Sequence, residues 1–422
     1  MSEVKIRSPL LAAGAILLSV ALLITGNGLQ VMLLPIRGGM EGFSAFQVGL
    51  LGSGYFFGFV LGCAFSPLLI IRAGHIRTFA ALVSIASAAA LGYPLAVDPL
   101  TWVLLRMITG FCLAGLYLVV ESWLNDQATN ETRGALISTY VTVNFTVITL
   151  GQMMVTLVRP DSFVLFSIAS VLVSLAAVPI VMTRSSQPPP VTIVRFRPRH
   201  MFQLSPTGTV SIFLVGVATG SFWSLGPSYA NAASGNVTDA ALFMSAAVMG
   251  GAVLQWPAGK ISDTIDRRLV MIGLALLSAV IGAVIVVMPH VTWLWLTLGF
   301  AFGAGLLPAY AIVSSHVFDF ADRSDYVEIS AGLLLLNGLG STVGPVLTSL
   351  TIELFGPGGM FITNGVVMIA LIGFVAERLR RREGLPEAEK EHFDLGTAGA
   401  VSVVGDEEAV QLSDLVVQEP AA

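Results

Sequence analysis

The sequence predicts an all-α integral membrane protein with twelve transmembrane helices, and composition and hydropathy are the observations that predict it. Of its 422 residues, 55% are hydrophobic and only 11% are charged, with a mean hydropathy of +0.84. Soluble globular domains carry about 25% charged residues. Because a helix needs about 20 apolar residues to cross a bilayer, we expect spans beginning near Pro9, Ala45, Thr78, Thr101, Ala135, Phe163, Gly208, Ala240, Leu269, Val291, Tyr326 and Met360.

Basic residues are distributed unevenly between the loops that join these runs. If both termini are cytoplasmic, only Arg37 and Arg159 of the 21 Lys and Arg residues lie outside the cell, and only Arg106 lies within the membrane. Lys and Arg concentrate in the cytoplasmic loops of membrane proteins. We therefore expect a multi-pass protein of the cytoplasmic (inner) membrane, with an even number of spans and both termini cytoplasmic.

A segment rich in proline and arginine, RSSQPPPVTIVRFRPRHMFQLSPT, divides the chain into six runs and six runs. Such a composition is typical of a linker. We expect an N-terminal six-helix bundle at 1–183, a cytoplasmic linker at 184–207, a C-terminal six-helix bundle at 208–376 and a disordered cytoplasmic tail at 377–422. The acidic tail has no sustained apolar period, so we expect it to be solvated; a regulatory role is the alternative.

The two halves carry similar glycine spacing and one specific loop motif. GFSAFQVGLLGSGYFFGFVLG in the first half is similar in its glycines to GNVTDAALFMSAAVMGGAVLQ in the second, which hints at an internal repeat. The following loop, GKISDTIDRR, resembles a loop motif of the major facilitator superfamily, whose transporters work by alternating access between two six-helix halves. Gly259, Asp263, Arg267 and Arg268 occupy the motif positions, and the resemblance implies that they gate the protein.

The first-half counterpart of this loop departs from the motif. SPLLIIRAGHIRTF keeps Arg72, Gly74 and Arg77 but has Ile71 where the superfamily usually has an aspartate. We still count these basic residues and the glycine as gating candidates, because the arginines can meet helix C-termini or lipid phosphates. A salt-bridge latch built on the missing acid is not expected in this half.

Three further segments narrow the resemblance. RAGHIRTFAAL, LLRMITGFCLAGLYLVVESWLNDQATNETRG and LQWPAGKISD together resemble the YcaD-like branch of bacterial major facilitator transporters, from the first helix to the twelfth. The resemblance implies the major facilitator fold and transport. It does not imply a particular substrate.

An arginine and a glutamate lie in the fourth apolar run. Arg106, Gly110, Tyr117 and Glu121 share one helix face, and the rise of 1.5 Å per residue separates Arg106 from Glu121 by roughly 22 Å, so they cannot pair. Arg106 with Gly110 resembles the superfamily's fourth-helix motif, in which an arginine faces the cavity and is associated with proton coupling. We expect Arg106 in the cavity; the alternative is that it extends to the outer headgroups.

Glu121 lies near the cytoplasmic boundary, close in sequence to Arg133. We expect Glu121 to pair with Arg133 or another loop arginine as part of a gate. The alternative is that Glu121 carries protons, since an ionisable residue at membrane depth is a candidate functional site.

Other polar and aromatic side chains fall on helix faces that could line the same cavity. The candidates for contact with substrate or proton, besides Arg106, are Asn27, Gln30, Tyr117, Asn144, Trp223, Tyr310 and Asn337. Each could equally hydrogen-bond a neighbouring helix. As a set, amides and aromatics with few fixed charges suit a small, moderately polar or amphipathic organic solute.

Neither an enzyme site nor a metal or cofactor site is predicted. The five histidines lie in loops, at helix ends or in the tail without an HExxH pattern, and the two cysteines have no metal-ligand spacing. We expect a monomeric secondary transporter that moves a small organic solute by alternating access, coupled to protons, with membrane lipid but no nucleic acid as a partner. The alternatives are an uncoupled uniporter or exporter of amphipathic compounds, and a non-transporting membrane receptor or scaffold on a carrier fold.

Overall fold

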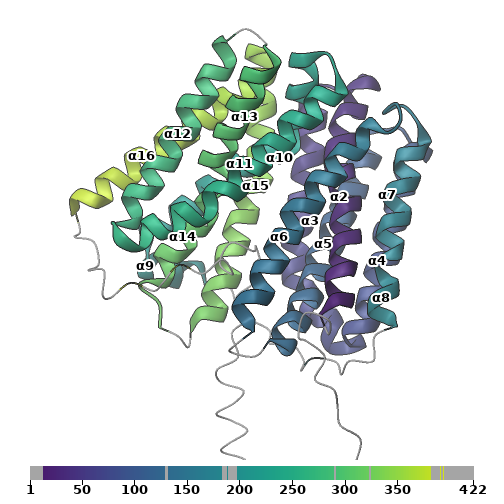
Figure 1. The fold of residues 1–422 in the computed structure, drawn as a ribbon, viewed down its shortest axis with the longest axis horizontal. Helices are drawn as coiled ribbons and strands as arrows, with labels where there is room; N and C mark the ends of the chain where they lie inside the picture. The colour runs from purple at the N-terminus through teal and green to yellow at the C-terminus, as the bar shows by residue number, and fades with distance from the viewer. Residues whose placement is uncertain are drawn as a thin grey trace, which may run out of the picture.

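The computed structural model describes residues 13–128, 132–182, 188, 197–288, 291–322, 325–381, 390 and 393. These residues form helices joined by short connections (Figure 1). The helices are α2 (Gly14–Met40), α3 (Ala45–Ala73), α4 (His75–Leu95), α5 (Pro99–Gln127), α6 (Arg133–Met153), α7 (Phe163–Leu175), α8 (Ala177–Val181), α9 (Pro198–Leu204), α10 (Pro206–Ser234), α11 (Val237–Thr264), α12 (Arg267–Val287), α13 (Thr292–Leu306), α14 (Ala309–Phe318), α15 (Tyr326–Phe355) and α16 (Gly359–Arg381), with a 3-10 turn, η1 (Met154–Thr156).

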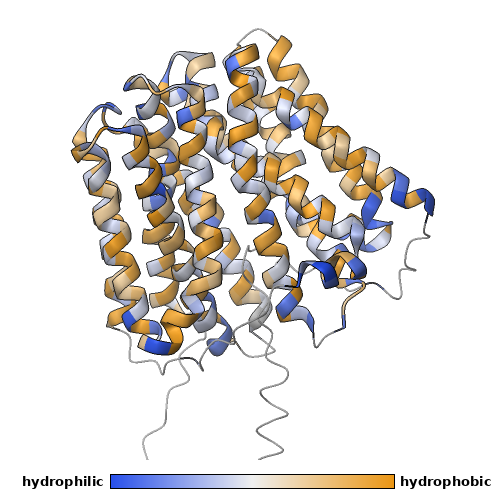
Figure 2. Ribbon diagram, turned by 180° about the vertical axis from the view of Figure 1, so that it is seen from behind, coloured by the Kyte–Doolittle hydropathy of each residue, from blue (hydrophilic) through white to orange (hydrophobic). Residues whose placement is uncertain are grey.

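Twelve helical segments of the described chain are long and apolar enough to cross a membrane, with α7 and α8 forming one segment and α13 and α14 another. This confirms the predicted class, an all-α membrane protein with twelve spans. Figure 2 shows hydrophobic residues along the lengths of the helices and hydrophilic residues gathered at their ends, which is the pattern that a bilayer requires.

The helices form two bundles side by side, α2 to α8 in one and α10 to α16 in the other (Figure 1). The bundles meet where α3 packs on α15, α6 on α11 and α2 on α10. We call the end of the molecule that carries α9, Gly74 and Asp266 the linker end, and the end that carries Phe43 and Asp98 the opposite end. Each half of the chain thus contributes helices to a shared central interface.

The linker and the tail contain more helix than the sequence suggested. Within the expected linker, α9 covers Pro198–Leu204 and α10 begins at Pro206, while residues 184–187 and 189–196 lie outside the described part. Helix α16 continues to Arg381, so the expected start of the tail, residue 377, lies inside a helix. Beyond that helix the description covers only Lys390 and Phe393.

The tenth span is broken, which the apolar run did not reveal. Helix α13 ends at Leu306 and α14 begins at Ala309, with Pro308 between them. Proline has no backbone N–H to donate and its ring crowds the preceding turn, so Pro308 interrupts the ladder. The break turns Leu307 toward the interface of the two bundles, where it lines a cavity.

Glycines bring α3 and α5 into backbone contact. A Cβ added to Gly58 would lie 1.9 Å from the carbonyl oxygen of Met107, and one added to Gly110 would lie 2.0 Å from the carbonyl oxygen of Tyr55. Small residues allow membrane helices to approach this closely and gain dispersion energy. Glycine is therefore required on both sides of the crossing.

The second half repeats the crossing between α11 and α13. A Cβ on Gly250 would meet the carbonyl oxygen of Phe300 at 1.9 Å, and one on Gly303 would meet that of Ala247 at 2.0 Å. This is the geometry expected of an internal repeat.

The register of the two crossings is also the same. Gly58 follows the N-cap Ser44 of α3, and Gly250 follows the N-cap Asn236 of α11, each by 14 positions (44 to 58 and 236 to 250). The glycine similarity noted in the sequence therefore reflects one packing arrangement used twice.

We predict that Gly58→Ala destabilises the protein, because the added methyl group meets a backbone oxygen that cannot rotate away. Overpacking of this kind costs about 1 to 3 kcal/mol, measured as a lower thermal unfolding temperature of the purified protein. Gly273→Ala is the matched control, since nothing lies within 4 Å of its added Cβ. Equal unfolding temperatures for the two variants would contradict the close crossing.

Candidate functional site

A cavity of about 350 Å³ lies between the two bundles. The first half contributes side chains from α2, α3, α5 and α6, and the second half contributes side chains from α10, α11, α15 and the break before α14. The polar and aromatic members of its lining are Asn27, Tyr55, Phe56, Phe59, Arg106, Tyr117, Glu121, Tyr140, Asn144, Phe145, Thr219, Trp223, Ser224, Gln255, Asn337 and Ser341.

The cavity brings together most of the residues that the sequence singled out for substrate or proton contact. Asn27, Arg106, Tyr117, Asn144, Trp223 and Asn337 all line it. The other two candidates, Gln30 and Tyr310, are described by the structure but do not line this cavity. Gln30 is buried almost one turn beyond Asn27 on α2, nearer the opposite end, and Tyr310 lies on α14, beyond the break.

Arg106 lies in the cavity, stacked on an aromatic ring. Its side chain is 7% exposed, its guanidinium carbon lies 4.3 Å from the centroid of the Tyr55 ring, and its Nη1 has no hydrogen-bond partner among the described residues. The tight crossing at Gly58 and Gly110 brings Tyr55 under the guanidinium, and a cation over a ring is stabilised by about 0.5 to 2 kcal/mol. Arg106 is held in place with donor capacity to spare.

Glu121 is buried at the other end of the cavity. Its side chain is 5% exposed, its Oε1 accepts a long hydrogen bond of 3.5 Å from the Tyr140 hydroxyl, and its Oε2 has no partner within the described chain. Glu121 and Tyr140 also border a second, smaller pocket with Asn125 and Leu136. The carboxyl group therefore separates two hollows.

The expected gate pairing of Glu121 does not appear among the described side chains. No ion pair of Glu121 occurs in that part of the molecule, and the side chain of Arg133 lies outside it. The pairing with Arg133 therefore stays a prediction.

The second-half loop motif forms a buried ionic corner at the linker end, which we call the α11–α12 corner (Gly259 to Arg268 with Asp319). Arg267 is 1% exposed, and its Nε donates to the Asp319 carboxylate at 2.8 Å. Its Nη1 lies 3.3 Å from Asp263 and donates to the Ser262 hydroxyl at 2.8 Å. Asp319 was not identified from the sequence. It could have been found as an acidic residue that directly follows an apolar run and lies at the same end of the molecule as the loop motif.

The neighbouring pair in this corner caps α12. Arg268 Nη2 lies 2.6 Å from Asp266, whose carboxylate also accepts the Arg268 backbone N–H at 2.9 Å. Burial raises the pKa of Asp266, but these hydrogen bonds and the charge of Arg268 outweigh it and hold the pKa below its usual value. A lowered pKa means that the stability contributed by Asp266 is present at neutral pH and is lost only as the pH falls through that lowered value.

The first-half corner has no such ionic core among its described residues. Arg72 and Arg77 are exposed, and Gly74 ends α3 with a φ of 81°. Counted from the N-caps of α3 and α11, Ile71 is equivalent to Asp263 and His75 is equivalent to Arg267. Ile71 is 47% exposed, and His75 is buried. The departure from the motif in the sequence is thus a structural asymmetry between the halves.

The opposite end of the interface is joined by hydrogen bonds between the halves. The Ser228 hydroxyl donates to the Pro35 carbonyl at 3.1 Å, and the Phe46 backbone N–H donates to the Glu353 carboxylate at 3.3 Å. These contacts hold α2 and α3 against α10 and α15 at this end.

Twelve membrane-spanning helices in two related halves, with a polar cavity between them, define a multi-pass membrane transporter. A family model described as Major Facilitator Superfamily matches residues 208–411. An uncharacterised transporter of that type from Enterobacter sp. (strain 638) is 27% identical over 372 residues, covering 87% of this chain and 93% of that protein. The uncharacterised transporter YcaD of Escherichia fergusonii is 25% identical over 368 residues, with the same two coverages.

The fold is similar to that of a transporter of known structure. The crystal structure of the nucleoside transporter NupG superposes with a TM-score of 0.74 at 12% identity, covering 88% of this chain and all of that one, at 100%. The chain is thus similar to major facilitator superfamily transporters, over its second half in the family model and over most of its length in the two relatives. Its resemblance to YcaD is confirmed over most of its length, and the relatives that it matches are described as transporters.

We predict that Asp319→Ala strongly destabilises the protein, because it leaves the buried Arg267 guanidinium without its nearest carboxylate. Breaking a buried ion pair by removing one partner costs about 3 to 5 kcal/mol, which thermal unfolding of the purified protein would detect. Asp322→Ala, three residues on and exposed, is the control. If both variants unfold like the wild type, Arg267 does not depend on Asp319.

Proposed function

We propose that this chain is a proton-coupled secondary transporter that moves a small organic solute across the cytoplasmic membrane by alternating access, acting as a monomer. The observation that carries the proposal is the cavity of about 350 Å³, which both halves line and which holds one arginine and one buried glutamate at separate places. The asymmetry of Lys and Arg supports placing the linker end and both termini in the cytoplasm.

The lining favours a particular class of solute. The volume is at the lower end of the range of small-molecule sites, which is about 300 to 1,000 Å³. Arg106 offers a free donor for an anionic or carbonyl group, and the aromatic side chains of Phe59, Tyr117 and Trp223 line the same cavity. A small amphipathic compound with an acidic or carbonyl group and an apolar body matches this arrangement.

Glu121 is the group that we assign to the proton. A carboxylate that is buried in an apolar bundle with no described cation beside it is costly when ionised, and a bound proton removes most of that cost. Its position between the cavity and the smaller pocket gives the proton a way to either side. Because Arg106 cannot reach it, solute and proton bind at separate sites and are linked through the conformations that the two halves adopt.

Neither alternative requires both charged groups. An uncoupled uniporter or exporter of amphipathic compounds would move solute without depending on Glu121, and a receptor or scaffold would move none. The two variants that follow separate these outcomes.

Arg106→Ala is expected to abolish solute binding while leaving the protein folded in the membrane. The ligand is first found as a compound that raises the unfolding temperature of the purified wild type, since binding to the native state alone stabilises it. The same compound should give no shift with Arg106→Ala, and Arg106→Lys, which keeps the charge but not the planar stacking, should give a reduced one. A full shift with Arg106→Ala would remove Arg106 from the site.

Glu121→Gln is expected to separate solute movement from the proton gradient. In liposomes, an imposed pH gradient should drive accumulation by the wild type and not by Glu121→Gln, while exchange of labelled for unlabelled solute should continue, because the neutral amide stands in for the protonated acid. Glu377→Gln, an acid exposed on α16, is the control. Gradient-driven accumulation by Glu121→Gln would contradict the assignment and favour the uncoupled alternative.

A further inference from the structure

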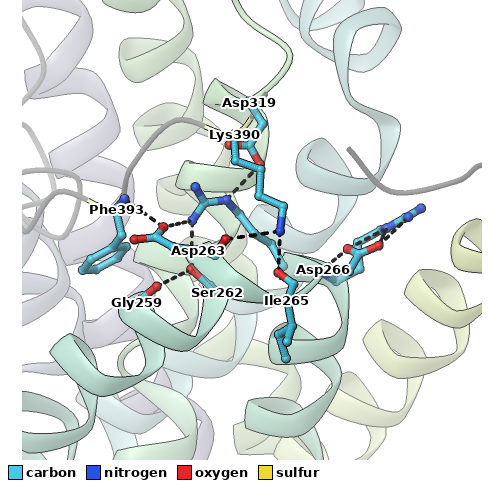
Figure 3. Close-up of polar contacts among 10 residues, drawn as sticks. Gly259, Ser262, Asp263, Ile265, Asp266, Asp319, Lys390 and Phe393 are labelled. Carbon is cyan, nitrogen blue, oxygen red and sulfur yellow. Dashed lines mark hydrogen bonds and ion pairs between the residues drawn. The ribbon is translucent and has the colours of Figure 1, made fainter. Parts of the chain in front are cut away.

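Two residues of the C-terminal tail contact the α11–α12 corner (Figure 3). The backbone N–H of Phe393 donates to the Asp263 carboxylate at 2.9 Å. The Lys390 ammonium donates to the carbonyl of Ile265 at 2.7 Å and approaches that of Asp263 at 3.5 Å. The tail is thus attached to the same aspartate that pairs with the buried Arg267.

The contact combines three kinds of complementarity. Ile265 is the C-cap of α11, and a lysine near the last carbonyls of a helix satisfies them and favours the negative end of the helix dipole. The Phe393 ring lies over Gly259, where an added Cβ would meet ring atoms at 2.2 Å. A glycine at this position therefore leaves the notch that the Phe393 ring fills. The Asp263 carboxylate accepts a hydrogen bond from the Phe393 backbone N–H beside it.

The notch faces the interior of the transporter. Gln255, which lines the central cavity, lies one turn before Gly259 on α11, so the two residues share a helix face. Helix α11 is also a helix of the second half that packs against the first half, through α6. Phe393 therefore covers the linker-end continuation of the surface through which the halves meet.

The chain can reach this position without difficulty. Nine residue steps separate Arg381, the last residue of α16, from Lys390, and they can span up to about 30 Å. The opposite end is already held by hydrogen bonds between the halves. A tail on the linker-end face of α11 acts at the end that these contacts leave free to move.

We propose that Lys390 and Phe393 together form a wedge: they dock at the Gly259 notch and the end of α11, and they restrain the halves from closing at the linker end. The inference rests on the alternating access proposed above. With the tail docked, α11 cannot pack its linker-end face against the first half. Release of the tail frees that face, so the segment sets the balance between the two access states and with it the rate of transport.

The test measures the distance between the halves at the linker end and needs no substrate. Spin labels are attached at Ala135→Cys on α6 and Leu269→Cys on α12, both exposed, after Cys63 and Cys112 are replaced by serine. Distance distributions are then recorded in lipid nanodiscs for the full chain and its tail variants. A closed linker end appears as a population at shorter distance.

Phe393→Ala should raise the ratio of closed to open molecules by roughly fivefold or more, the scale expected for losing one favourable contact in a two-state equilibrium. Gly259→Ala should give the same shift by filling the notch, and the double variant should add nothing. Phe202→Ala, which removes an exposed phenylalanine of α9, is the matched control and should resemble the wild type. Phe393→Cys with Gly259→Cys, once oxidised, should remove the closed population.

Two results would overturn the wedge, and they differ in what else they affect. If open and closed populations appear but Phe393→Ala and Gly259→Ala leave their ratio unchanged, the tail does not restrain the halves and the proposed transport mechanism stands. If the wild type and every variant give the same single distance, the halves do not alternate and both proposals fail.

Discussion

The arrangement of the molecule depends on backbone contact between helices at glycine crossings. In each half, a glycine on the second span and a glycine on the fourth each lie against a backbone carbonyl group of the other helix, at Gly58 and Gly110 and again at Gly250 and Gly303. Lipid offers no hydrophobic drive for helices to associate, so dispersion at such close crossings supplies much of the stabilisation. The same crossing in the first half fixes the site, because it holds the Tyr55 ring beneath Arg106.

The two halves share this framework but differ in how they are fastened at the linker end. The second half has a buried arginine between two carboxylates, and the corresponding corner of the first half has an isoleucine and a histidine at the equivalent places. A rigid corner on one side gives the tail a fixed surface on which to dock. The asymmetry therefore suits a protein in which the second half is fixed at the linker end by its ion pairs, and in which the docked tail regulates the contact between the two halves there.

Much of the fold followed from the sequence because lipid constrains it so strongly. Apolar runs of the required length gave the twelve spans, and the Gly259 to Arg268 motif identified the corner. The sequence could not give the break at Pro308, since proline occurs inside several of the other spans without ending them. Tyr55 and Asp319 were also missed, because each matters through a contact with a residue distant in sequence, and helical periodicity carries no information about which helices cross.

The cavity residues show the same limit at finer scale. Asn27 and Gln30 are three positions apart on α2, yet Asn27 lines the cavity and Gln30 does not. A helix face assigned from periodicity spans more than 100° of the helix circumference. Only part of that face, over part of the helix length, borders the cavity. Glu121 was interpreted as a gate residue because it lies near the end of its apolar run. Its burial between two hollows involves Tyr140 of the next helix, which borders both hollows and donates a hydrogen bond to it.

The central claim is that the halves must separate at the opposite end for solute to pass. A disulfide across that end tests it most directly, using Phe46→Cys on α3 and Glu353→Cys on α15, since the Phe46 backbone N–H already donates to the Glu353 carboxylate at 3.3 Å. In a background without Cys63 and Cys112, the account predicts that oxidation stops solute flux in liposomes and that reduction restores it. Undiminished flux through the fully cross-linked protein would contradict alternating access in this transporter.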